Sequence, residues 1–229
     1  NTLSGPTADL RVRKAIAYAI DRDLLVDGLK GGYSQKANVM VADTSFGFDP
    51  SFKSYAFNPE KAKVLLKEAG LGDTPINIYT APAVFDQRVV EAIQQMLKDV
   101  GINAKIVGMD MGAFLKRMQG SAADKDMTSF GRWSCACQDA DGILYSMLHS
   151  SSIWSNIKNA GLDQLLDSAR SSLDSKTRLN FYNAAHQIIE NELPLLPLYQ
   201  VGIIYAGNKN LNWRPTANES LFIMDMSWK

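Results

Sequence analysis

The sequence predicts an α/β fold, in which a mixed sheet is flanked by helices that outnumber the strands. The main observation is a strand–helix–strand order. Residues 75–80 alternate as a strand, residues 84–100 are strongly amphipathic with helical spacing, and residues 102–107 form a second strand. Such a unit crosses over right-handed. No linker or change in composition divides the chain, so we expect residues 1–229 to form a single domain.

Two helices are expected before this unit. Residues 9–20 place Val12 and Ile16 on one face, with basic residues that include Arg13 on the opposite face. Asp21 can cap a second, shorter helix, because an aspartate side chain accepts from the first free backbone N–H groups.

The strongest helix start is Asn58-Pro59-Glu60, which combines an N-cap residue, a proline at the first helical position and an acid on the helix dipole. Gly70 ends this helix. Residues 33–57, which precede it, show no periodicity and are expected to form a long loop.

The second half of the chain continues the alternation more weakly. The expected elements are a short helix at 110–119, a strand at 127–133, two amphipathic helices at 162–173 and 176–192, and extended segments at 193–199 and 201–206. Asp174 caps the later of the two helices. The tail, residues 208–229, gives weak signals.

Composition excludes several classes of protein. Hydrophobic residues make up 46% of the chain, and the 24 basic and 24 acidic residues give no net charge. A nucleic-acid binder or a polybasic membrane binder would need a field of one sign, so neither is expected. No apolar run reaches the roughly 18 residues of a membrane span. The N-terminus lacks the pattern of a signal peptide, as it would in a mature exported chain or a fragment.

A candidate binding site lies in residues 130–142, where a strand ends at an aromatic and an acidic loop begins. Ligands of α/β proteins bind at the carboxyl ends of strands. Trp133 could stack on a ligand, with a cation–π contribution of about 0.5–2 kcal/mol. Asp139 and Asp141 could bind an ammonium or guanidinium group. The loop therefore predicts a site for a polar small molecule with a cationic end.

Each of these residues also has a purely structural interpretation. Asp139 could cap the helix that follows, Asp141 could cap or face solvent, and Trp133 could pack in the core. Arg132 could bind a ligand carboxylate or form a structural ion pair. Trp154 could form a second aromatic wall, although packing is the interpretation we favour.

The two cysteines, Cys135 and Cys137, allow three interpretations. Two free thiols that pack as small apolar residues are favoured, a disulfide across one intervening residue comes second, and a metal site comes last. A thiolate metal site would need more ligands, and His149 and His186 are the only histidines of the chain. We expect His186 to be a partly buried structural residue and His149 to be exposed.

No catalytic motif is present, so we expect no enzyme activity, no cofactor and no bound metal. The alternative is a small α/β metal- or thiol-dependent domain that uses Cys135, Cys137 and Asp139. Stoichiometric metal or a thiol of strongly depressed pKa would identify it.

Four segments in order resemble one protein family. Residues 10–22 (LRVRKAIAYAIDR) and 57–71 (FNPEKAKVLLKEAGL) are similar to two helices of the C-terminal lobe of family 5 extracellular solute-binding proteins. These are the peptide-, nickel- and opine-binding receptors of bacterial ABC importers. Residues 133–141 resemble the family's ligand-side loop, and residues 173–199, which end in LPLLPLY, resemble its late helix and strand.

The resemblance implies a periplasmic-binding-protein-like fold of type II, cluster C. It implies that the chain is the C-terminal lobe plus a returning tail, without the N-terminal lobe that forms the other wall of the cleft. The expected function is capture of a peptide, peptide-like or opine-like solute for delivery to an ABC permease. The expected location is the periplasm, or the outer face of the membrane in a Gram-positive host.

The resemblance also implies roles for the loop residues. In peptide-binding members the tryptophan matched by Trp133 lines the cleft, and an aspartate three residues later holds the ligand's α-amino group. Ala136 stands at that position here, while Asp139 and Asp141 match a later Asp-x-Asp pair. This departure weakens the case for ordinary di- and oligopeptide ligands, and a modified peptide, an opine-like conjugate or another polar solute is as plausible.

Overall fold

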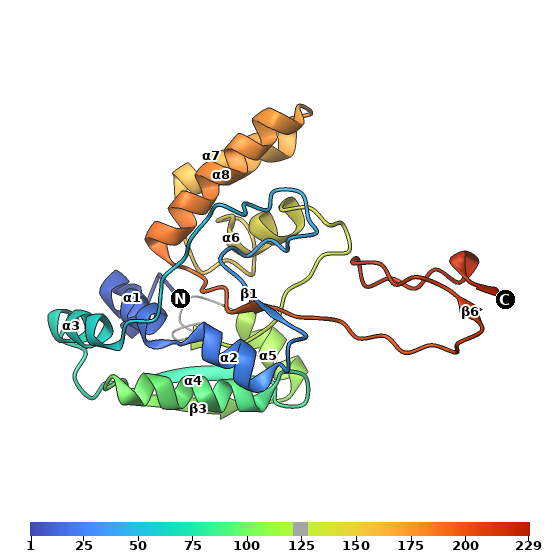
Figure 1. Ribbon diagram of the computed structural model, residues 1–229. Coiled ribbons are helices and arrows are strands. Elements are labelled where there is room, and N and C mark those ends of the chain that lie inside the picture. The colour runs from blue at the N-terminus through green and yellow to red at the C-terminus, as the bar shows by residue number, and fades with distance from the viewer. Residues whose placement is uncertain (121–127) are drawn as a thin grey trace.

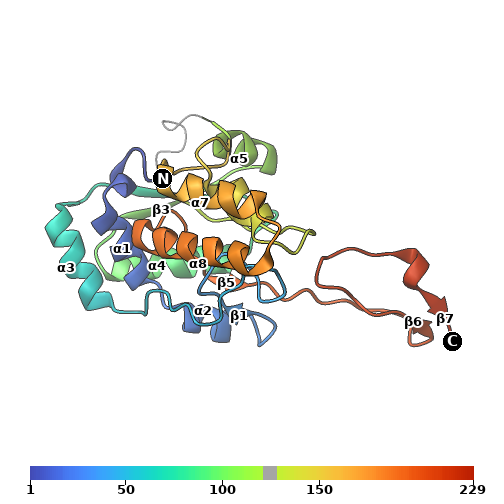
Figure 2. The ribbon, with the colours of Figure 1, turned by 90° about the horizontal axis from the view of Figure 1, so that it is seen from above.

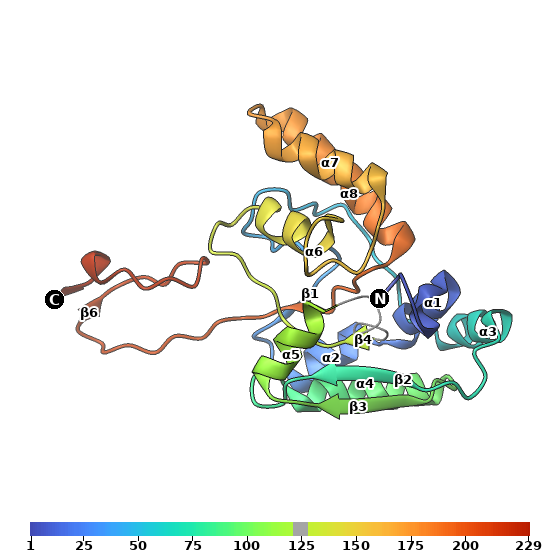
Figure 3. The ribbon, with the colours of Figure 1, turned by 180° about the vertical axis from the view of Figure 1, so that it is seen from behind.

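The computed structural model describes residues 1–120 and 128–229. Its main sheet has three parallel strands in the order β3–β2–β4, which are β3 (Ala104–Gly108), β2 (Ile76–Thr80) and β4 (Thr128–Ser129). The helix α4 (Gln87–Asp99) connects β2 to β3 and covers the sheet (Figure 3). This confirms the α/β class and the strand–helix–strand unit.

The prediction of a mixed sheet is wrong in detail, because every pair within the main sheet is parallel. Antiparallel pairing occurs in two separate ladders, β1 (Gln35–Lys36) with β5 (Tyr199–Gln200), and β6 (Leu211–Asn212) with β7 (Ser227–Trp228). Of the expected strand at 193–199, only Tyr199 is part of a strand (β5). Pro194 and Pro197 have no N–H to donate to a ladder. The expected strand at 127–133 is reduced to β4, and its first residue lies outside the described ranges.

Helices on the N-terminal side form one layer with the sheet (Figures 1 and 2). They are η1 (Pro6–Ala8), α1 (Leu10–Ala19), α2 (Arg22–Leu29), α3 (Pro59–Ala69) and, later in the chain, α5 (Met111–Met118). The side chains of Asp21 and Asn58 cap α2 and α3 as expected. Apolar residues of α1, α3 and α4 pack with β2 and β3 into a continuous core that includes Val12, Ile76 and Leu97.

Arg13 does not lie on the polar face where the helical spacing placed it, for it is buried with 7% of its surface exposed. Its guanidinium donates hydrogen bonds to the carbonyl oxygens of Thr7 and Ala8, each at 2.8 Å, and of Glu192 at 2.7 Å. These acceptors are brought to it by other segments of the fold, so the helical pattern of α1 alone could not reveal them.

A second layer lies above the sheet and contains a helical hairpin (Figure 1). Its elements are η2 (Asp141–Tyr145), a π-helical turn that continues into α6 (Ser146–Leu148), and the long helices α7 (Ala160–Ser171) and α8 (Ser175–Glu192). Leu144, Leu162 and Tyr182 are fully buried in its core, and the loop at residues 33–57 contributes Val41 to the same core. Thus the long unpatterned loop is packed against the helices.

Residues 201–229 form an arm that extends away from both layers (Figures 1–3). It ends in the short β6–β7 ladder, with η3 (Ile223–Asp225) just before β7. Several large apolar side chains of this arm are exposed, among them Ile204, Leu221, Ile223, Met224 and Trp228. None of the helices in the described part of the chain is long and apolar enough to cross a membrane.

Candidate functional site

The candidate site is built on the loop at residues 130–140, which leaves the carboxyl end of β4 and rises to η2 (Figure 3). The loop is attached to the second layer by two backbone hydrogen bonds with Phe46. The N–H of Phe46 donates to the carbonyl of Gln138 at 2.9 Å, and the N–H of Ala140 donates to the carbonyl of Phe46 at 2.8 Å. The loop therefore bridges the two layers at the sheet edge where α/β proteins bind ligands.

Trp133 and Trp154 lie together, although 20 intervening residues separate them in the chain. Their ring centroids are 5.3 Å apart with the planes at 71°, an edge-to-face arrangement. The indole N–H of Trp133 donates to the carbonyl oxygen of Gly142 at 3.1 Å, and both indoles are half-buried. The structure thus joins two of the five predicted site residues into one aromatic surface.

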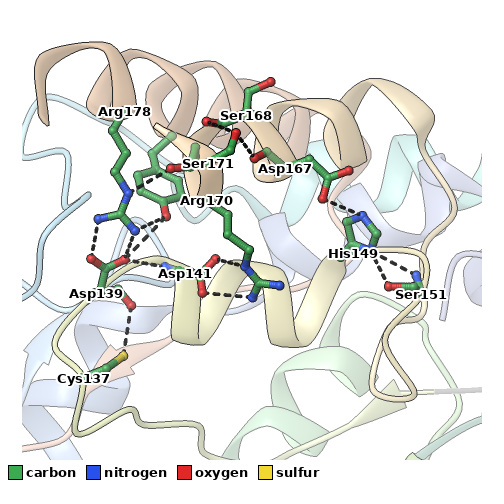
Figure 4. A network of polar contacts seen from close by, with 12 residues as sticks. Cys137, Asp139, Asp141, His149, Ser151, Asp167, Ser168, Arg170, Ser171 and Arg178 are labelled. Carbon is green, nitrogen blue, oxygen red and sulfur yellow. Dashed lines mark hydrogen bonds and ion pairs between the residues drawn. The ribbon is translucent and has the colours of Figure 1, made fainter. Parts of the chain in front are cut away.

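Asp139 is paired with Arg178 on α8 through both of its oxygens (Figure 4). The two contacts are 2.6 Å from Nη1 to Oδ2 and 2.8 Å from Nη2 to Oδ1. Arg178 also donates to the hydroxyl of Tyr182 at 2.9 Å. The hydrogen bond to Asp139 raises the pKa of Arg178, and burial raises the pKa of Tyr182 to about 12. The carboxylate is therefore held inside the chain as half of a bidentate ion pair.

Asp141 is paired in the same way with Arg170 on α7 (Figure 4). Its two oxygens accept from Nε and Nη2, each at 2.9 Å. The guanidinium carbon lies 3.2 Å from the ring centroid of Tyr145, so the cation is also stacked on an aromatic face. The hydrogen bond to Asp141 raises the pKa of the guanidinium. Two adjacent helices thus each supply one arginine to one aspartate of the loop.

The capping interpretation of Asp139 is supported in part. The π-helical turn η2 has Ala140 at its N-cap position, with no side-chain cap. Asp139 Oδ1 nevertheless accepts from the backbone N–H of Asp141 at 2.9 Å. The Asp139 side chain consequently accepts a backbone hydrogen bond at the start of η2 and also forms the ion pair with Arg178 of α8.

The expectation of two free thiols is wrong, because Cys135 and Cys137 form a disulfide. The N–H of Gln138 donates to the carbonyl oxygen of Cys135 at 3.1 Å and closes the turn that contains both cysteines. Gln138, just after this pair, has a φ of 49° in the left-handed region. Both sulfurs lie directly over Gly142, where a Cβ atom would sit 2.5 Å from Cys137 Sγ and closer still to Cys135 Sγ. Within the described ranges, no three His, Cys, Asp or Glu side chains gather as a metal site.

Arg132 forms an ion pair with Glu219 of the arm, with 2.6 Å between Nη2 and Oε2. This agrees with the structural interpretation of Arg132. Both side chains are more than one-third exposed, so the pair lies at the rim of the loop. It is a contact between the candidate loop and the arm.

The two histidines differ in how well they were predicted. His186 is buried, and its Nε2 lies 3.1 Å from the carbonyl oxygen of Gly47, as a structural histidine should. His149 was expected to be exposed, but only 12% of its side chain is. Its ring stacks on Tyr145 at 4.2 Å between centroids, with Nε2 3.5 Å from Asp167 Oδ1 (Figure 4). The reason is that η2 and α6 turn this residue toward α7.

Sequence reasoning missed Arg170, Arg178 and Tyr182, which determine the electrostatics of the loop. Arginines on amphipathic helices are common on solvent-facing surfaces, so neither arginine stands out in the sequence. The spacing of four residues between Arg178 and Tyr182 does place a cation and a hydroxyl on one helical face. That was the one local signal available.

A separate hollow of about 230 Å³ lies beside the β1–β5 ladder, lined in part by Val39, Phe48 and Phe52. Its polar side is closed by Asp43, whose two oxygens accept from Gln35 at 2.7 Å and Gln200 at 2.8 Å. These polar groups pair with one another, and the rest of the lining mixes polar side chains such as Asn38 and Asp49 with the apolar ones.

Comparison with known proteins places these features in a family. Residues 1–155, which include both tryptophans and both aspartates of the site, match the bacterial extracellular solute-binding proteins, family 5 (middle region). The chain is 32% identical over 222 residues to di/tripeptide-binding protein 2 of Pseudomonas aeruginosa, covering 93% of this chain and 41% of that protein. It is 31% identical to the glutathione-binding protein GsiB of Escherichia coli, covering 92% of this chain and 43% of that protein.

Solved structures agree with this assignment. HbpA2 of Haemophilus parasuis superposes with a TM-score of 0.85 at 25% identity, over 100% of this chain and 47% of its own. DppA of Helicobacter pylori, solved with the peptide STSA, superposes with a TM-score of 0.79 at 29% identity, over 87% of this chain and 40% of its own. The chain spans less than half the length of these relatives. It belongs to the bacterial extracellular solute-binding proteins of family 5, a family of binding proteins rather than enzymes.

Proposed function

We propose that this chain is one lobe of a two-lobed receptor that captures a peptide or peptide-like solute between its lobes and delivers it to an ABC permease. The observation that carries the proposal is the Trp133–Trp154 pair, whose first indole lies on the loop that follows the carboxyl end of the parallel strand β4. The names of the relatives, a di/tripeptide-binding and a glutathione-binding protein, support a small peptide as the ligand.

The two indoles are the proposed direct ligand contacts. Half-buried aromatic rings can stack on a peptide plane or on a cation without prior desolvation of a charge. We assign Asp139 and Asp141 to positioning, because each already meets an arginine through both oxygens. The alternative prediction, that one of them binds the ligand's ammonium group, would require that ion pair to open or be shared.

The arm supports the two-lobed arrangement. Exposed apolar side chains are costly in water, and contiguous ones mark a surface that another part of a protein covers. Ile204, Leu221, Phe222, Ile223 and Met224 all have more than 40% of their surface exposed on this arm. We propose that the remaining lobe of the same protein covers them. The relatives, which are more than twice as long as this chain, leave room for such a lobe.

In this proposal the ligand acts by shifting an equilibrium between open and closed lobes. A ligand stabilises the closed form only by contacts that it makes there and not in the open form. Contacts with Trp133 on this lobe and with groups on the other lobe would meet that condition. We place the receptor outside the cytoplasmic membrane, in the periplasm or on the cell surface, which is also where a disulfide such as Cys135–Cys137 persists.

The test is ligand binding by the two-lobed protein that contains this chain, with calorimetry against Ala-Ala, Ala-Ala-Ala and S-methylglutathione. Trp133→Ala is expected to weaken binding of the preferred ligand about tenfold or more, as for other aromatic anchors. Leu173→Ala is the matched control, because Leu173 is fully exposed between α7 and α8. A Trp133→Ala protein that folds normally and binds with unchanged affinity would refute the assignment of the site.

A further inference from the structure

We propose that the Cys135–Cys137 disulfide exchanges with the thiol of a cysteine-containing peptide and holds that ligand through a reversible mixed disulfide. The inference rests on the proposed function, since it names a ligand class for the same loop. The disulfide joins the only two cysteines of the chain and lies two residues after Trp133.

The disulfide and the aromatic surface meet at one residue. Gly142 lies beneath both sulfurs, which leave no room there for a Cβ atom, and its carbonyl oxygen accepts the indole N–H of Trp133 at 3.1 Å. Cys137 is exposed and Cys135 is half-buried. A peptide stacked on Trp133 therefore lies on the same loop as an exposed cysteine of the disulfide, and exposed disulfides are the labile ones.

The two sulfurs have opposite polar surroundings. The backbone N–H of Cys137 points at Cys135 Sγ, with 3.2 Å between nitrogen and sulfur. Cys137 Sγ instead lies 3.7 Å from the carbonyl oxygen of Asp139 (Figure 4). An N–H donor stabilises negative charge on sulfur, whereas a carbonyl oxygen opposes it. Cys135 is thus the better leaving group, and the exposed Cys137 is the sulfur that an incoming thiolate attacks.

The exchange needs no other reagent. The ligand's thiol gives its proton to solvent, and the resulting thiolate attacks Cys137 Sγ to form a new S–S bond. The Cys135–Cys137 bond breaks, and its electron pair remains on Cys135 as a thiolate beside the Cys137 N–H. One thiol and one disulfide enter, and one thiol and one mixed disulfide leave. Attack by Cys135 on Cys137 reverses the step and releases the ligand as a free thiol.

The test uses the two-lobed protein incubated with reduced glutathione, quenched with N-ethylmaleimide and mapped by tandem mass spectrometry. The expected product carries glutathione on Cys137 and ethylmaleimide on Cys135, favoured over the reverse arrangement about tenfold. Glutathione is also expected to react about tenfold faster than 2-mercaptoethanol at equal thiolate concentration, because only the peptide is positioned by Trp133. The Cys135→Ser/Cys137→Ser protein is the control and should gain no glutathione on this loop.

Two results would overturn the inference and leave the proposed function standing. One is the absence of any adduct on this loop while S-methylglutathione or a dipeptide still binds by calorimetry. The other is equal reactivity toward glutathione and 2-mercaptoethanol, which would show an accessible disulfide without recognition. Failure of the proposed function differs from both, because then none of the thiol-free peptides binds.

Discussion

Arg178 holds both carboxylate oxygens of Asp139, at 2.6 and 2.8 Å, and so joins the candidate loop to the middle of the second layer. Only about one-fifth to one-quarter of each side chain is exposed. A bidentate pair in such surroundings is stronger than a surface ion pair and more costly to break from one side. Asp139, which the sequence predicts as a contact for a cationic ligand group, is thus already paired with an arginine of the same chain.

Replacing Asp139 by asparagine is expected to lower the free energy of unfolding by about 1–3 kcal/mol, because a half-buried guanidinium loses its counter-ion. Urea unfolding followed by circular dichroism measures this. Glu60→Gln is the matched control, since Glu60 pairs with Lys63 at 2.8 Å with 79% of its side chain exposed. Glu60→Gln is expected to lower the free energy of unfolding by less than about 1 kcal/mol. Equal losses in the two variants would show that the Asp139 pair is an ordinary surface contact.

Gly142→Ala is expected to destabilise the chain by about 1–3 kcal/mol, because the new methyl group would overlap both disulfide sulfurs. Gly28→Ala is the control. Gly28 lies on the exposed side of α2 with its nearest neighbouring atom at 3.9 Å, so alanine there should be neutral or stabilise by up to about 1 kcal/mol. Removing the disulfide with Cys135→Ser/Cys137→Ser should relieve part of the Gly142→Ala cost. If Gly142→Ala destabilises the double-serine protein as much as it destabilises the wild type, the sulfurs are not the cause of the destabilisation.

His186 makes stability depend on pH. Burial lowers the pKa of His186 from its ordinary value of 6.5, so the folded chain keeps this ring neutral where the unfolded chain protonates it. The unfolded state then binds more protons, and the free energy of unfolding falls as pH drops below about 6.5. Glu190, whose pKa burial raises, acts in the opposite direction, so the measurement must compare two proteins.

The comparison is wild type against His186→Gln, which keeps an N–H donor that could reach the Gly47 carbonyl but does not titrate. Thermal or urea unfolding between pH 5 and pH 7 is expected to show a steeper loss of stability for the wild type as pH falls. Parallel pH profiles for the two proteins would exclude His186 as the source of the dependence.

Truncation after Ala206 is expected to change the stability of the isolated chain by less than about 1 kcal/mol. The arm contributes one ion pair with the candidate loop, Arg132–Glu219, and such exposed pairs contribute little. The truncated chain should also self-associate less, because exposed apolar side chains are removed with the arm. Urea unfolding and sedimentation measure the two effects. A loss of several kcal/mol would show that the arm packs on the body in solution.

The helices could be predicted because their signals are local. Asn58-Pro59-Glu60 predicts the start of α3, and both cap and proline are found where expected. The same holds for Asp174, whose side chain caps α8. The parallel alignment of β2 and β3 also followed from their order along the chain. The pairing of β1 with β5 outside the main sheet could not be predicted in this way, since it depends on where the chain returns after α8.

The candidate site was only half predictable. Trp133 stands out by its place after a strand, but its contact with Trp154 depends on how the chain folds back after α6. The roles of Asp139 and Asp141 are set by arginines from α7 and α8, and no sequence spacing links those helices to the loop. The sequence favours free thiols over the disulfide, because two cysteines separated by one residue can be joined only in a tight turn. That turn, closed by the Gln138 N–H on the Cys135 carbonyl, is visible only in the structure.

The arm contacts the body both at its base and farther along, which restricts how it can move. At its base Gln200 pairs with Gln35 and the N–H of Gly202 donates to Ser34 Oγ at 3.4 Å, and farther along Glu219 meets Arg132. Residues 200–219 and the loop thereby close a ring of protein. A rotation of the arm about β5 must either break the Arg132–Glu219 contact or pull the loop along, and Trp133 is the next residue on that loop. Whatever surface sets the angle of the arm thus also acts, through this ion pair, on the residue next to Trp133.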